Sequence, residues 1–193
     1  MRHMTMAMAI VAVAALAAGL GGCVPQKKGA AAPGKFVLRV NAGAEKEYVD
    51  QSGAAWLPDQ EWKDGAKYGA VDGKTIVREN LKIAGTKAPD VFLTERYSMT
   101  AYRFVVPNGK YAVRLHFAET YPGIDTQGPR VFSVSIQGKP ALADFDVMKT
   151  AGGFAKPVVK EFKGVAVTDG KLLIEFTAKS QNPEINGIEI LGE

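Results

Sequence analysis

Apolar and polar residues alternate along several short stretches of this sequence, and this period of two constrains the fold more than any other feature. The clearest stretches are residues 36–41, 111–118, 132–136 and 172–177. Successive side chains of a β-strand point to opposite faces of a sheet, so the alternation indicates strands with one buried face. Past Leu20, no stretch has helical periodicity over a window of about eleven residues. The sequence therefore predicts an all-β domain.

Turn-forming residues fall between the predicted strands. Pro107-Asn108-Gly109, Gln137-Gly138-Lys139 and Asp169-Gly170 each separate two alternating runs. Short strands joined by such turns, with no crossover helices between them, are typical of antiparallel sheets. We predict an antiparallel, jelly-roll-like β-sandwich over residues 36–193. The segment 42–88 is dense in glycine and aspartate, and we expect it to supply loops at one end.

The N-terminal residues have a different character. Residues 1–22 contain Arg2 and His3 followed by an apolar run, which is the pattern of a cleaved export signal. Leu20-Gly21-Gly22-Cys23 resembles the bacterial lipobox, and this resemblance implies that Cys23 carries a lipid. Residues 23–35, rich in alanine, glycine, proline and lysine, are predicted to be a flexible tether. The alternative is an ordinary cleaved signal followed by a chance cysteine.

The chain contains one cysteine, so no intramolecular disulfide is possible. Lipidation of Cys23 would place the protein in the cell envelope, with the membrane as a partner through the lipid. The residue after the cysteine is Val24 rather than the aspartate associated with inner-membrane retention. We therefore expect an outer-membrane lipoprotein if the host is Gram-negative.

The inventory of reactive residues argues against an enzyme. After removal of the signal the chain has one histidine, His116, which alternation places on the polar, exposed face of its strand beside Arg114. A zinc site needs further nitrogen or sulfur ligands, and a serine hydrolase needs a G-x-S-x-G elbow that the sequence lacks. Residues 29–35 spell G-x-x-x-x-G-K, but Phe36 replaces the hydroxyl residue of a phosphate loop. We expect no catalytic residue, metal or cofactor.

Glycoside hydrolysis stays open, because it needs only two suitably placed carboxylates. Glu95, Glu119, Asp125, Asp144, Asp146 and Glu184 are available, but the sequence supports no particular pair. The formal net charge is +4, and lysine and arginine are interspersed with acids rather than gathered in a stripe. Nucleic-acid binding therefore lacks its electrostatic basis.

Aromatic residues gather in the predicted loops and turns. They are Tyr48, Trp56, Trp62, Tyr68, Tyr97 and Tyr121. A tyrosine in such a place can cover the CH face of a sugar and hydrogen-bond its hydroxyls, or it can pack beneath a long loop. Trp56 and Tyr111 are assigned to the core.

An ordered set of motifs resembles the malectin domain. The set comprises RVNAG (39–43), DQSG (50–53), KYG (67–69), LTERY (93–97), YRFVVPNG (102–109), LHFAETY (115–121), DFDV (144–147) and NPEINGIEI (182–190). The resemblance covers nearly all of residues 36–191. It implies a jelly-roll-like β-sandwich that binds carbohydrate without catalysis.

The resemblance also implies a site. It places Tyr68, Tyr97 and Tyr121 around a sugar, with Gln181 completing the cleft where the family has an acid. The aromatic that follows the last tyrosine in the family is Pro122 here. Asp59 and Glu119 are expected to anchor turns or strand ends. The alternative to carbohydrate binding is a protein-interaction or structural module of the envelope on the same scaffold, and a glycosidase is the third hypothesis.

Overall fold

The computed structural model describes residues 35–193. The predicted signal peptide, Cys23 and all but the last residue of the predicted tether lie outside this range. The strands are β1 (Val37–Asn41), β2 (Tyr48–Val49), β3 (Ala55–Trp56), β4 (Tyr68–Val77), β5 (Thr94–Val105), β6 (Gly109–Phe117), β7 (Val131–Ile136), β8 (Lys139–Asp146), β9 (Val158–Val167), β10 (Lys171–Ser180), β11 (Glu184–Ile185) and β12 (Gly187–Gly192). The short helices are η1 (Pro89–Leu93), α1 (Ile124–Gln127) and α2 (Val147–Ala151).

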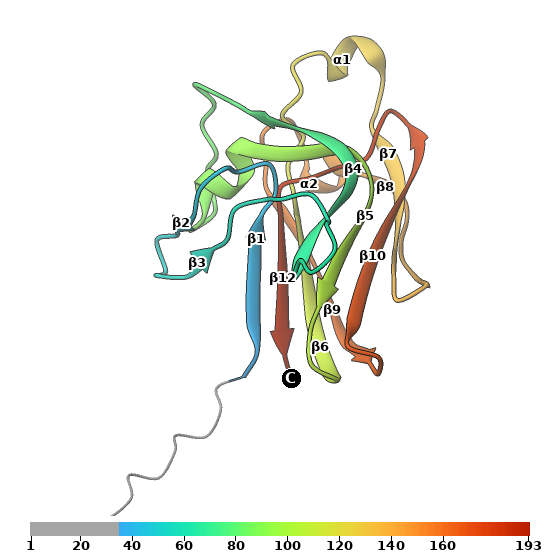
Figure 1. Cartoon of the computed structure of the whole chain (residues 1–193). Helices are drawn as coiled ribbons and strands as arrows, with labels where there is room; N and C mark the ends of the chain where they lie inside the picture. The colour runs from blue at the N-terminus through green and yellow to red at the C-terminus, as the bar shows by residue number, and fades with distance from the viewer. Residues whose placement is uncertain (1–34) are drawn as a thin grey trace, which may run out of the picture. The chain divides into compact units, whose positions relative to one another are not determined.

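The strands form two main antiparallel sheets (Figure 1). The first has the order β1-β12-β6-β9. The second has the order β11-β5-β10-β7-β8, with β4 also paired to β5, and a small third sheet consists of β2 and β3. This antiparallel sandwich confirms the predicted fold class. In residues 35–193, no helix is long and apolar enough to cross a membrane.

The core lies between the two sheets, where the apolar side chains of alternating positions meet. In β7, Phe132, Val134 and Ile136 are buried while the residues between them are half-buried. Phe132 also belongs to an aromatic group with Phe117 and Phe145, whose ring centroids lie 5.0 to 5.8 Å apart. Aromatic rings at such separations stabilise each other beyond the area they bury.

Two features of the sequence analysis are confirmed. Trp56 and Tyr111 are both core residues, each 2% exposed. The turn between β7 and β8 contains Gln137 and Gly138 with φ of 52° and 69°. Two successive positive φ angles define the tight hairpin turn that matches the right-handed twist of the flanking strands.

The segment 42–88 differs from its prediction, because it contains the ten-residue strand β4 in addition to loops. The register between β4 and β5 shifts between Val71 and Asp72. Asp72 and Gly73 both have positive φ there, 63° and 87°. The pairing passes from Val71–Ala101 to Asp72–Met99, so Thr100 of β5 is the extra residue of this bulge. The positive φ angles of Asp72 and Gly73 interrupt the alternation along β4, so a period of two does not reveal the whole strand.

His116 is buried, not exposed as predicted. A second core cluster covers its face of β6; it consists of Trp56, Ile83, Ala88, Val91, Phe92 and Ala118. The His116 ring lies 5.1 Å from the Trp56 ring between centroids, and its Nε2 lies 3.0 Å from a carboxylate oxygen of Glu189. Alternation shows that the two faces of a strand differ, but it cannot show what covers the polar face.

Candidate functional site

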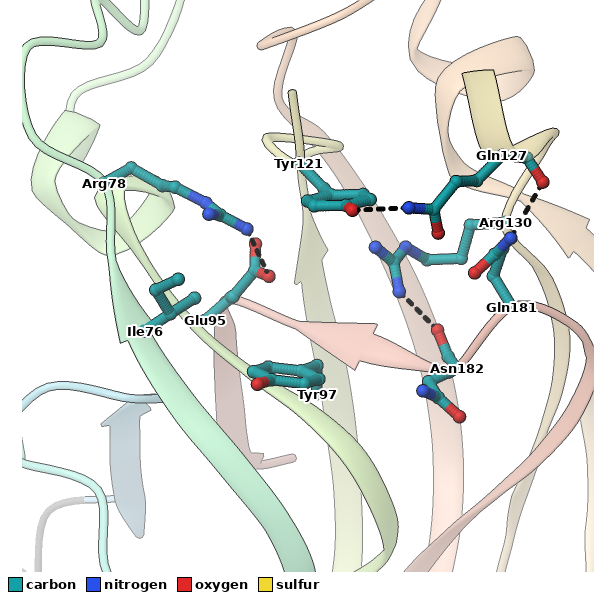
Figure 2. Close-up of a pocket in the computed structure, with 9 residues that line it drawn as sticks. All are labelled: Ile76, Arg78, Glu95, Tyr97, Tyr121, Gln127, Arg130, Gln181 and Asn182. Carbon is teal, nitrogen blue, oxygen red and sulfur yellow. Dashed lines mark hydrogen bonds and ion pairs between the residues drawn. The ribbon is translucent and has the colours of Figure 1, made fainter. Parts of the chain in front are cut away.

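A pocket of about 290 Å³ opens among the loops at one end of the sandwich (Figure 2). It is lined by Ile76, Arg78, Glu95, Tyr97, Tyr121, Gln127, Arg130, Gln181 and Asn182. Figure 2 shows the rings of Tyr97 and Tyr121 on opposite sides of the pocket. Arg78 and Glu95 form one wall, and Arg130 and Gln181 belong to the other.

The structure brings together three of the four residues predicted for the cleft, namely Tyr97, Tyr121 and Gln181. Tyr97 lies on β5, between Lys74 of β4 and Glu184 of β11. Tyr121 follows the end of β6, and Gln181 lies between β10 and β11. Segments distant in the sequence therefore meet at this pocket.

Tyr68, the fourth predicted residue, does not line the pocket. Its ring is 9% exposed and its hydroxyl donates a hydrogen bond to the carbonyl oxygen of Pro58, at 2.9 Å. Burial raises the pKa of this phenol, and the neighbouring Asp59 carboxylate adds to the rise. Tyr68 begins β4 whereas Ile76 lies near its end, and eight residues of strand span roughly 26 Å. The prediction that Tyr68 shares the cleft is corrected on these grounds.

Hydrogen bonds fix the rim of the pocket. Gln127 of α1 donates through its amide to the Tyr121 hydroxyl at 2.7 Å, and Gln181 donates through its amide to the Gln127 carbonyl oxygen at 2.8 Å. Gly123 allows the ring of Tyr121 to lie close to the backbone, since a Cβ there would be 2.6 Å from the phenol carbon that carries the hydroxyl. The tyrosine and both glutamines are thus held in one connected arrangement.

Two ion pairs, one half-buried and one buried, support the walls. Arg78 donates to Glu95 at 3.0 Å, and Thr120 bridges them by donating to Glu95 at 2.7 Å and accepting from Arg78 at 3.2 Å. On the other side, Arg130 donates from Nε to Glu119 at 2.7 Å and from an η nitrogen to the carbonyl oxygen of Asn182.

Glu119 also accepts the backbone N–H of Tyr121 at 3.0 Å, so it is an anchor as expected. Asp59 is likewise an anchor, because it accepts from the backbone of Gly43 at 2.8 Å and from Arg96 at 2.7 Å.

Sequence reasoning missed the contributions of Arg78, Gln127 and Arg130. Arg78 lies just beyond β4, and its partner Glu95 is 17 positions away in the sequence. Arg130 precedes β7, 11 positions from Glu119. Neither arginine belongs to one of the recognised motifs, so only the fold reveals that they line a pocket.

Glu184 is a buried acid at the base of this cluster. Its side chain is fully buried, and among residues 35–193 neither carboxyl oxygen has a hydrogen-bond partner. Burial raises the pKa of Glu184 well above its usual range, and the nearby Glu95 carboxylate raises it further. Burial therefore favours the protonated, uncharged form of Glu184, whereas Arg78 and Arg130 are paired with Glu95 and Glu119.

The glutamine variant Glu184→Gln is expected to raise the free energy of unfolding at pH 7 by roughly 1 to 3 kcal/mol. The unfolded chain releases the Glu184 proton above pH 4.5, whereas the folded protein retains it up to the raised pKa. Stability therefore falls as pH rises between these two values, and glutamine, which does not titrate, removes that loss.

Urea unfolding at pH 7 and at pH 4 checks this, because both states of the wild type are largely protonated at pH 4 and the gain should then disappear. The matched control is Glu45→Gln, at an exposed glutamate, which should change stability little at either pH. An equal gain for Glu184→Gln at the two pH values would contradict the explanation.

The pocket can hold a polyhydroxylated ligand. It combines two aromatic faces with amide, guanidinium and carboxylate groups, and so offers both apolar surface and hydrogen-bond partners. In residues 35–193, no group of three or more histidine, cysteine, aspartate or glutamate side chains is placed to hold a metal ion.

The fold and this pocket define an antiparallel β-sandwich domain with a polar, tyrosine-lined pocket in its loops. The sequence model of the malectin domain matches residues 36–190. The chain therefore belongs to the malectin domain family.

Three similar proteins illustrate the relationship. A probable receptor-like protein kinase of Arabidopsis thaliana is 33% identical over 186 residues, which cover 80% of this chain and 21% of the kinase. The crystal structure of Bacteroides uniformis β-glucuronidase is similar with a TM-score of 0.72 and 26% identity, covering 82% of this chain and 18% of that one. The crystal structure of the plant peptide RALF23 in complex with FER and LLG2 has the same fold, with a TM-score of 0.67, 21% identity and coverage of 82% and 48%.

The chain spans about a fifth of the length of the Arabidopsis relative. The similarity does not extend to the kinase domain of that protein. It concerns a β-sandwich module that occurs within larger proteins.

Proposed function

We propose that this protein binds carbohydrate without catalysis, in the pocket between Tyr97 and Tyr121. The observation that carries the proposal is the placement of two tyrosine rings on opposite sides of one polar pocket (Figure 2). A sugar ring presents CH groups on its faces and hydroxyls at its edge. The tyrosines match the faces, and Gln181 and Arg78 can exchange hydrogen bonds with the edge. Membership of the malectin domain family supports the same conclusion.

Binding is favoured over hydrolysis by the state of the carboxyl groups. A glycosidase needs two carboxyl groups that reach the bond to be cleaved. Glu95 accepts from Arg78 and Thr120, and Glu184 is fully buried. The β-glucuronidase is similar to this chain over 18% of its own length, so its activity does not transfer. A panel of chromogenic glycosides tests this point, since turnover of any of them would contradict non-catalytic binding.

Tyr97→Ala and Tyr121→Ala are each expected to weaken glycan binding about 30-fold or more, because a buried aromatic contact at the centre of a binding site is commonly worth about 2 kcal/mol. A glycan array with the purified full-length protein identifies the ligand, and titration calorimetry measures the loss. Tyr68→Phe is the matched control: it removes a tyrosine hydroxyl outside the pocket and should leave the glycan profile unchanged. If both alanine variants fold and retain the wild-type profile, the site is wrongly assigned.

Protein recognition is the second candidate function. Its support is that the FER structure of the same fold is a complex with a peptide and with LLG2. At 21% identity that likeness concerns the fold, and the pocket of this chain, at about 290 Å³, is of a size for a small ligand rather than for a protein surface. Capture from detergent-solubilised membranes separates the candidates, because a carbohydrate-bound complex should be released by free oligosaccharide and a protein-bound one should not.

We also propose that the domain acts at the cell envelope, attached through a lipid on Cys23. The lipobox-like residues Leu20-Gly21-Gly22-Cys23 support this. Membrane fractionation of cells that produce the wild type or Cys23→Ser tests it, and a serine variant that remains fully in the membrane fraction would contradict it.

A further inference from the structure

A groove of about 480 Å³ lies on one side of the sandwich, between the edges of the two main sheets. β9 is an edge strand of the first sheet, and β8 is an edge strand of the second. The lining includes Ile136, Lys139, Pro140, Ala141, Phe162 and Lys163. No lining residue of this groove also lines the pocket between Tyr97 and Tyr121, so the two are separate sites.

The apolar part of the groove is continuous with the core. Ile136 is 4% exposed and belongs to the main core cluster. Ala141, Phe162 and Val165 are half-buried and pack against that cluster from the two edges. Their exposed surface is in contact with water, and covering such apolar surface is favourable. The groove therefore offers an apolar floor to a ligand that enters between the sheets.

Neither edge strand is suited to pairing with a further strand. The register between β7 and β8 shifts twice, and the register between β6 and β9 shifts once. Pro140 of β8 has no N–H to donate, and Gly164 of β9 has a φ of 67°. Bulges and proline at a sheet edge prevent the addition of a strand. These edges disfavour a peptide strand or a second copy paired through its backbone, and leave a ligand that contacts side chains.

The charged side chains of the groove are both cationic. Lys139 and Lys163 are exposed, and among residues 35–193 no aspartate or glutamate lines the groove. In the same range Lys139 forms no ion pair, and Lys163 lies 3.5 Å from Glu161 with 73% of its side chain exposed. Glu193 accepts the backbone N–H of Gly164 at 3.2 Å but does not line the groove. An apolar floor beside two lysines matches a ligand with an apolar body and one negative charge.

We propose that this groove binds a single-chain fatty acid, with its alkyl chain between β8 and β9 and its carboxylate beside Lys139 and Lys163. An alkyl chain needs no hydrogen-bond partner, so it can lie along the half-buried apolar side chains. A carboxylate accepts charge-assisted hydrogen bonds from lysine. The groove has the size of ligand pockets, which span about 300 to 1,000 Å³. Fatty-acid binding is independent of the proposed carbohydrate binding.

The test compares chain lengths and head groups. Octanoate, decanoate, laurate and myristate are titrated by calorimetry, below the concentrations at which they form micelles, into the purified full-length protein. The protein is used as Cys23→Ser, so that it carries no lipid of its own. Affinity should rise about tenfold for each two CH₂ groups added, until the groove is filled. Dodecyltrimethylammonium, which has the same chain length as laurate and a positive head group, should bind about fivefold more weakly than laurate or worse.

Two variants test the apolar part of the groove. Phe162→Ala removes an apolar wall, and Ala141→Leu fills part of the space between the sheets. Each should weaken laurate binding about tenfold. Val159→Ala is the matched control, at an exposed apolar residue of β9 outside the groove, and should bind laurate as the wild type does. Unfolding temperatures show which variants are folded.

A double variant tests the cationic part. Lys139→Gln with Lys163→Gln should reduce the preference for laurate over dodecyltrimethylammonium to about twofold or less, and should keep the dependence on chain length. Lys74→Gln, at an exposed lysine of β4 outside the groove, should keep the full preference.

Several results would overturn the proposal. One is that none of the four acids binds, and another is that laurate binding is the same in the wild type and every folded groove variant. The second result would mean uptake elsewhere, such as by the apolar run of residues 7–20 that all variants share. Binding of phosphatidylglycerol vesicles without binding of the monomeric acids would assign the groove to a membrane surface. Dimers in sedimentation velocity that Phe162→Ala separates, again without fatty-acid binding, would assign it to a second copy. The pocket between Tyr97 and Tyr121 is unaffected by these results, so the glycan experiments decide carbohydrate binding separately.

Discussion

Replacing Arg130 with methionine is expected to lower the free energy of unfolding by about 3 to 5 kcal/mol. The Arg130 side chain is 7% exposed and its partner Glu119 is completely buried. Without the guanidinium, the Glu119 carboxylate would remain buried with no compensating cation, and the carbonyl oxygen of Asn182 would lose its donor. Losing one partner of a buried pair costs far more than the pair itself contributes, because the remaining charge cannot reach water.

Urea unfolding measures this effect, and Arg114→Met is the matched control. Arg114 makes a similar bond to Glu161, at 2.8 Å, but 41% of its side chain is exposed, so the control should lose at most about 1 kcal/mol. The double variant Arg130→Met with Glu119→Met should recover much of the stability, since both buried charges are then gone. Equal losses for the two single arginine variants would show that burial of the Arg130 pair does not matter.

Gly43→Ala is expected to destabilise the protein by about 2 to 5 kcal/mol, the sum of a left-handed backbone penalty and a steric clash. Gly43 has a φ of +83°, and a Cβ at this position would lie 2.7 Å from the carbonyl carbon and 2.9 Å from the backbone nitrogen of Glu95. These are backbone atoms of β5 and cannot move aside as a side-chain tip can. Because Glu95 lines the pocket, the variant should also weaken glycan binding.

Gly53→Ala isolates the steric part of this effect. Gly53 has the same φ of +83°, but nothing in the described part of the chain lies within 4 Å of the point that an alanine Cβ would occupy. It should lose only about 1 to 2 kcal/mol, the cost of the backbone conformation. Thermal or urea unfolding of both variants makes the comparison, and similar losses would mean that the close approach to Glu95 is unimportant.

The fold class could be predicted from sequence because local patterns agree with the tertiary structure along most strands. In β7 and β10, apolar side chains recur at every second position and turn residues flank the run. The pattern fails in β4, where the positive φ angles of Asp72 and Gly73, opposite the bulge in β5, interrupt it. The alternation also misleads at His116. The side chains that bury this face of β6 come mainly from residues 56–92, and no local pattern assigns them to that face.

The candidate site could be predicted only in part. Tyr97, Tyr121 and Gln181 belong to recognisable motifs and do meet at the pocket. Tyr68 belongs to an equally clear motif, yet the length of β4 and a bond to Pro58 keep it in the core. Arg78 and Arg130 are placed by ion pairs between separate segments. Such pairs depend on how strands are ordered in the sheets, which sequence alone does not specify.

The pairing of β1 with β12 has a consequence for how such a domain can be joined to other proteins. Val37 and Leu191 are partners across these strands, so the chain enters and leaves the sandwich at points about one strand spacing apart. Figure 1 shows this end of the sandwich opposite α1, whose Gln127 belongs to the pocket. A domain whose two ends lie this close together can be inserted into a surface loop of another protein without moving the ends of that loop apart. The end of the domain that carries the pocket would then point away from the host protein.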